Sequence, residues 1–79
     1  GLLRKVKAAL QFWEDSIVKL LEKGMELGEF IDSCQPRPFA SLMISLIEGG
    51  VMLSKVTGQI DHINHAVDHI ETLIRQLKA

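Results

Sequence analysis

Three histidines are the residues of this chain with the clearest capacity for chemistry. His62, His65 and His69 are spaced three and four apart, so a helix would place them on one face. Imidazoles at positions i and i+4 can ligate zinc. The apolar residues of the same segment fall across the helix, however, and Asp61 and Asp68 accompany the histidines. We therefore expect a solvated polar face on the solvent side of the helix, with no bound metal and no other cofactor.

The remaining reactive groups do not form a recognisable catalytic site. Cys34 is the only cysteine, which excludes an intramolecular disulfide and favours a reducing cytoplasm, and its sequence neighbours include no base that would activate the thiol. Glu22 and Glu26 fit the charged face of an amphipathic helix better than an acid–base pair. The sequence has no glycine-rich phosphate loop and no Gly-x-Ser-x-Gly motif. We expect a protein that is not an enzyme.

Size and charge narrow the class further. The chain has 79 residues, of which 47% are hydrophobic and 24% charged, with a formal net charge of −1. This composition is typical of one small globular domain, and a domain of this size usually needs a disulfide, a metal or a partner subunit for stability. The only basic cluster is Arg4, Lys5 and Lys7. Such a cluster is too small to indicate a nucleic-acid or membrane surface.

The elements that would position these groups are helices. Apolar residues recur at steps of three and four, which predicts helices over residues 2–27, 36–56 and 59–78. Pro36 and Pro38 suit the first turn of the second helix, where their missing N–H groups cost nothing. The connections are short, so neighbouring helices should be antiparallel. The sequence predicts an all-α fold of three antiparallel helices.

The second predicted helix is apolar on two sides. Leu42, Leu46, Leu53 and Val56 lie on one flank, and Ala40, Met43, Ile44, Ile47 and Val51 lie on the other. Two companion helices cannot cover both flanks, and each large side chain left in water forgoes about 1.5–3 kcal/mol. Glu48 and several serines favour a buried helix over a membrane span. We expect a partner chain or further parts of the protein to cover this helix.

Two glycines and one phenylalanine also indicate that other protein packs against these helices. Gly49 and Gly50 lie in the middle of the second helix, where each costs about 1 kcal/mol relative to alanine. Close packing against another helix is the favoured explanation, and a pocket wall or a kink is the alternative. Phe12 lies off the apolar stripe of the first helix, so it would face water in an isolated three-helix bundle.

Several short motifs together resemble a known family. These are Leu27-Gly28-Glu29-Phe30, then Pro36, Ala40-Ser41-Leu42 and Leu46-Ile47-Glu48-Gly49-Gly50. This succession resembles the C-terminal domain of the tetracycline-repressor (TetR) family of transcriptional regulators. The resemblance extends from about Leu3 to Leu77. The diagnostic helix-turn-helix head of that family is not among these residues.

The resemblance implies a fold and a set of functional residues. Family members are homodimers whose last two helices pair with the same two of the other subunit in a four-helix bundle, beside a mostly apolar effector pocket. Candidates for the pocket are Trp13, Ile17, Leu20, Met43 and Ile47, all of which are also normal core residues. Candidates for the subunit interface are Leu46, Gly50, Leu53, Val67, Ile70 and Ile74. The pattern does not decide which side of the second helix faces the partner.

Residues 1–79 are therefore expected to form a single, partial ligand-binding and dimerisation domain of a bacterial regulator in the cytoplasm. Its expected partners are a second copy and a small apolar or amphipathic effector, with DNA reached only through an absent N-terminal head and no role at a membrane. The alternative is a free-standing helical adaptor that dimerises or docks on a partner helix. A weaker alternative is a metal- or redox-responsive sensor that uses the histidines and Cys34.

Overall fold

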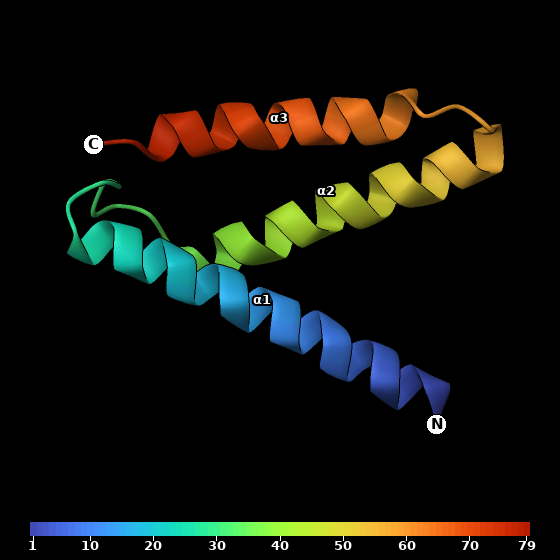
Figure 1. Ribbon diagram of the computed structural model, residues 1–79, viewed down its shortest axis with the longest axis horizontal. Helices are drawn as coiled ribbons and strands as arrows, with labels where there is room; N and C mark the ends of the chain where they lie inside the picture. The colour runs from blue at the N-terminus through green and yellow to red at the C-terminus, as the bar shows by residue number, and fades with distance from the viewer.

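The computed structural model describes residues 1–79 as three helices: α1 (Leu2–Glu26), α2 (Pro36–Thr57) and α3 (Asp61–Leu77). Consecutive helices run in opposite directions, and the N-terminal half of α1 diverges from α2 (Figure 1). The molecule is flat, with extents of 40 × 32 × 13 Å. The predicted all-α, three-helix fold is confirmed, and every predicted helix boundary lies within two residues of the observed one.

Local chemistry accounts for where α2 begins and ends. Pro36 occupies the first turn, where its missing N–H group would have no helical partner. At the other end, Gly58 adopts a left-handed conformation with φ of 73°, and its N–H donates to the carbonyl oxygen of Ser54 at 2.9 Å. A side chain at this position would be strained, so glycine makes a sharp stop before α3.

The small core lies where the end of α1, the 27–35 connection and the end of α3 meet. Leu21, Cys34 and Leu77 form a buried cluster there. The Ile31 N–H donates to the Leu77 carbonyl at 2.8 Å, and the Ala79 N–H donates to the Glu29 carbonyl at 3.0 Å. These main-chain bonds hold the C-terminal end of the chain against the connection between α1 and α2.

Gly24 belongs to this core. Helix α1 continues through it to Glu26. The Gly24 carbonyl accepts the N–H groups of Glu29 and Phe30, at 2.8 and 3.2 Å. A Cβ atom added at this glycine would overlap the ring of Phe30. The residue is small because the chain folds back over it.

Much of the apolar surface remains uncovered. Only nine of the 79 residues are buried, and no large side chain is fully enclosed. Both flanks of α2 remain open, with Leu53 44% and Ile47 40% exposed. Phe12 is 69% exposed, as predicted. Three helices therefore do not cover the second helix, which confirms the expectation drawn from its sequence.

This uncovered surface gives α2 an ambiguous character by itself. By length and composition it could cross a membrane, and a helix buried on both sides in a soluble protein passes the same test.

One exposed polar contact joins α2 to α1, since the Arg37 guanidinium lies 2.7 Å from Asp15 and 3.2 Å from Glu14. Hydrogen bonding to Arg37 lowers the pKa of the Asp15 carboxyl. Solvent screening makes such a surface pair a minor contributor to stability.

Candidate functional site

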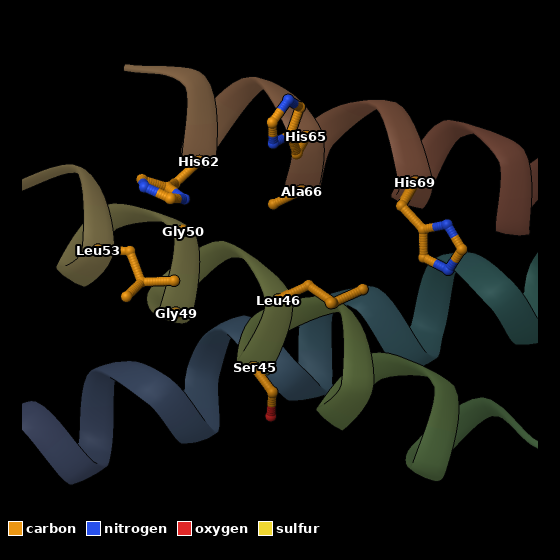
Figure 2. Close-up of a pocket in the computed structure, with 9 residues that line it drawn as sticks. All are labelled: Ser45, Leu46, Gly49, Gly50, Leu53, His62, His65, Ala66 and His69. Atoms are coloured by element: carbon orange, nitrogen blue, oxygen red, sulfur yellow. The ribbon is translucent and has the colours of Figure 1, made fainter. Parts of the chain in front are cut away.

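A groove between α2 and α3 brings the three histidines beside the leucines of α2. We call it the histidine groove, and Figure 2 shows its lining. It has a volume of about 340 Å³ and is lined by Ser45, Leu46, Gly49, Gly50 and Leu53 from α2, and by His62, His65, Ala66 and His69 from α3.

The groove exists because α3 approaches α2 closely at one point. A Cβ atom added to Gly50 would lie 2.9 Å from the His62 carbonyl oxygen and 3.2 Å from Ala66 Cβ. The Ile63 N–H donates to Ser54 Oγ at 3.3 Å, so a side chain of α2 satisfies a backbone donor in the first turn of α3. Close helix packing is therefore the role of Gly50, and α2 passes through Gly49 and Gly50 without interruption.

The expectation that the histidines lie on the solvent side of α3 is correct for His65 and His69, which are exposed, whereas His62 is half-buried. All three also border the groove at the α2 contact, which was not predicted. The reason is that α3 packs through Ala66 and not through the middle of its apolar stripe. By helical geometry, the histidines lie about 40–100° to one side of Ala66, and Val67 and Ile74 lie about 80–100° to the other.

The three imidazoles do not converge on one point. Figure 2 shows His62 and His69 at opposite ends of the groove, with His65 directed away from α2. No group of three His, Cys, Asp or Glu side chains in the chain is placed to hold a metal ion.

A second hollow lies among all three helices. This apolar cavity has a volume of about 210 Å³, and its six lining residues are all hydrophobic: Ile17, Leu20, Leu21, Phe30, Met43 and Ile74. The structure thus brings together three of the residues predicted to line a pocket, namely Ile17, Leu20 and Met43. Trp13 and Ile47 do not line it, and both are exposed. Leu21 on α1 also lines the cavity and was not among the predicted residues. Phe30 was missed because the fold of the 27–35 connection cannot be read from helical periodicity.

The residues predicted for the subunit interface fall on two different surfaces. Leu46, Gly50 and Leu53 line the histidine groove. Val67, Ile70 and Ile74 border a separate hollow along α3 together with Glu71, Arg75 and Lys78, and Ile74 also reaches the apolar cavity. Gly50 and Ile70 are buried within the chain itself, and Gly50 lies at the close contact between α2 and α3.

Cys34 is part of the core and lines none of these three hollows. It packs with Leu21 and Leu77, and burial raises the pKa of its thiol. Because the thiolate is the reactive form, we expect Cys34 to react with Ellman's reagent at least about tenfold more slowly in the folded chain than in urea. Equal rates in the two states would show that the thiol is accessible and would contradict a structural role.

Comparison with known proteins identifies a family and solved structures that are similar to this chain. Residues 1–70 match the family described as "Tetracyclin repressor-like, C-terminal domain". A TetR transcriptional regulator from Chloroflexus aurantiacus superposes with a TM-score of 0.91 at 30% sequence identity, covering 98% of this chain and 39% of that one. A TetR-family transcriptional regulator from Cytophaga hutchinsonii gives a TM-score of 0.91 at 24% identity, covering 99% of this chain and 39% of its own, and so supports the fold alone. None of the curated proteins matches the chain. The chain therefore spans about two fifths of the length of these two regulators.

Proposed function

Because the chain belongs to the tetracycline-repressor-like C-terminal domain family, we propose that it is the effector-binding and homodimerisation domain of a bacterial transcriptional regulator. The family consists of regulators and not enzymes, in agreement with the sequence prediction. The observation that carries the proposal is the flat three-helix layer, which leaves apolar surface open on both of its faces.

The exposed apolar surface on the two faces of the layer must be covered by other protein. Leaving large apolar side chains in water forgoes about 1.5–3 kcal/mol for each, so a stable regulator must cover them. A second copy packed against one face would bury part of this surface. Further helices of the regulator would cover the other, since the matching regulators are more than twice as long as this chain.

The apolar cavity is the proposed seat of the effector. Pockets for small molecules usually measure about 300–1,000 Å³, are mostly apolar and contain a few polar groups. At about 210 Å³, with six hydrophobic lining residues, this cavity supplies an apolar portion of such a pocket. Helices outside residues 1–79 would complete it and contribute the polar groups. The proposed effector is therefore a small apolar or amphipathic molecule.

Regulation would follow from a difference in affinity. An effector shifts a regulator between two states only to the extent that it binds one of them more tightly. In this proposal, the two states differ in the position of a helix-turn-helix head, outside these residues, relative to DNA. The regulator works in the cytoplasm.

Trp13 and Ile47 are exposed in these three helices, and further helices packed against them would include both residues in the pocket.

A cavity-filling substitution tests the effector site. We expect Met43→Trp to weaken the binding of the apolar dye anilinonaphthalene sulfonate at least about fivefold, because the larger ring occupies the cavity. The measurement is a fluorescence titration of the purified chain. Met52→Trp is the matched control, because Met52 is 60% exposed on the same helix and lines neither hollow. Equal dye affinity in the Met43→Trp variant and the original chain would contradict the proposed pocket.

A further inference from the structure

We propose that the apolar cavity selects an aromatic ring, and that the effector enters it with one uncharged ring while its polar groups remain outside. The inference rests on the proposed effector site and adds to it the chemical class of the molecule that fits. We assign the selection to Phe30 and Met43, the aromatic and the sulfur-containing members of the lining.

The volume of the cavity suits one ring with a short substituent. An engineered cavity of about 150 Å³, lined by leucine, isoleucine and phenylalanine, stays dry and takes up benzene. The cavity of this chain measures about 210 Å³ and has a lining of the same residue types, with one methionine added. The additional space corresponds to about two groups the size of a water molecule, at about 30 Å³ each. A benzene ring that carries one or two further heavy atoms therefore matches the cavity.

The lining keeps charge out of the interior of the cavity. All six lining residues are hydrophobic, so a charged or unpaired polar group would lose its hydration there without gaining a partner. Leu20 is 71% exposed, whereas the other five lining residues are buried or half-buried, which places the opening beside Leu20. We therefore expect the polar groups of the effector to lie on the Leu20 side, where helices outside residues 1–79 would contact them.

The ring of Phe30 is held in place in the cavity wall. Its Cδ2 and Cε2 atoms lie so close to Gly24 that a Cβ atom added there would overlap them. The Phe30 N–H donates to the Gly24 carbonyl oxygen at 3.2 Å, and Phe30 also forms an isolated antiparallel bridge with Lys78. An anchored ring is a preorganised surface, so a ligand that packs against it does not have to order it first.

Met43 supplies a second contact that favours aromatic rings, from α2. Aromatic pairs gain stability from offset-stacked or edge-to-face contact beyond the area that they bury. The sulfur of methionine also makes favourable contacts with aromatic rings. A saturated ring of the same carbon number forms neither kind of contact, and burial of its slightly larger apolar area would by itself favour it. A preference for the aromatic ring therefore isolates the contribution of Phe30 and Met43.

Benzyl alcohol and cyclohexylmethanol are matched probes of this preference, because they differ only in whether the ring is aromatic. Each alcohol is titrated into the purified chain, and the methyl signals of the lining residues are followed by carbon–hydrogen correlation NMR. We expect both alcohols to shift the methyl signals of Ile17, Leu21 and Ile74. The dissociation constant of benzyl alcohol is expected to be at least about threefold lower than that of cyclohexylmethanol.

Variants assign the preference to its residues. Phe30→Leu keeps an apolar wall without a ring and is expected to reduce the ratio of the two dissociation constants to about one. Met43→Leu conserves volume and is expected to reduce the ratio by a smaller amount. Phe12→Leu, the same change at a position that is 69% exposed and outside the cavity, should leave the ratio unchanged. Circular dichroism checks that each variant keeps its helices.

The outcomes separate this inference from the effector site on which it rests. If neither alcohol shifts the methyl signals of the lining, the proposed effector site is overturned. If both alcohols bind and cyclohexylmethanol binds equally well or more tightly, the aromatic selection is overturned and the effector site stands. A ratio that does not change in Phe30→Leu or in Met43→Leu would also overturn the selection, and Met43→Leu decides alone should Phe30→Leu fail to fold.

Discussion

Replacing Leu21 by alanine is expected to lower the free energy of unfolding by about 2–5 kcal/mol, the range found for buried leucines that leave a cavity. Leu21 is 5% exposed and joins Cys34 and Leu77 in the one core cluster of the chain. A chain of this size has little stability to spare, so a loss of this magnitude should leave much of it unfolded. Urea denaturation followed by circular dichroism measures the change.

The preceding residue provides a matched control. Leu20 is the same residue type on the same turn of α1, yet it is 71% exposed. We expect Leu20→Ala to change the free energy of unfolding by no more than about 0.5 kcal/mol. Similar losses for Leu20→Ala and Leu21→Ala would mean that the core does not lie at the junction of α1, the 27–35 connection and α3.

The two adjacent glycines of α2 should respond to alanine in opposite directions. In Gly50→Ala the new Cβ would lie 2.9 Å from a backbone oxygen of α3, which cannot move without separating the helices. Overpacking of this kind costs about 1–3 kcal/mol, and the better helix propensity of alanine recovers only about 1 kcal/mol of it. Gly50→Ala is therefore destabilising.

Gly49→Ala meets no atom within 4 Å and should stabilise the separate chain by up to about 1 kcal/mol. Both glycine variants are compared with the original chain by urea denaturation followed by circular dichroism. A loss of stability in Gly49→Ala, or a gain in Gly50→Ala, would show that α3 contacts α2 in a different register.

Helical periodicity was sufficient to predict the elements of this fold. Apolar residues at steps of three and four fixed the three helices, and Pro36 marked the start of α2 where the structure has it. Gly58 stops α2 by adopting a left-handed conformation. These features depend on interactions within one segment, which is why the sequence alone reveals them.

The positions of the histidines could not be predicted in the same way. Periodicity identifies the apolar stripe of α3, but it does not say which edge of the stripe meets α2. That choice depends on Gly50, whose missing side chain lets Ala66 approach, and this contact joins residues sixteen positions apart. Ser54, near the end of α2, was the available signal, because its hydroxyl accepts the Ile63 N–H.

The short motifs that carry the family resemblance have identifiable structural roles. Gly28 adopts φ of 76° just after α1, a conformation that favours glycine. Phe30 packs over Gly24 and borders the apolar cavity. Ala40, in the second turn of α2, is fully buried. The motifs therefore record backbone turns and close contacts, which explains why they mark a fold more clearly than an effector.

The hydrogen bonds between the 27–35 connection and the C-terminal end have a mechanical consequence. These hydrogen bonds restrain the C-terminal end of α3, and the short turn at Gly58 restrains its N-terminal end. We therefore expect α2 and α3 to move as one rigid unit. The N-terminal half of α1 has no such fastening, and Leu2 and Leu3 there are largely exposed. The main thermal motion of this molecule should therefore be a hinge rotation of α1 about its C-terminal end, while α2 and α3 keep their relative positions.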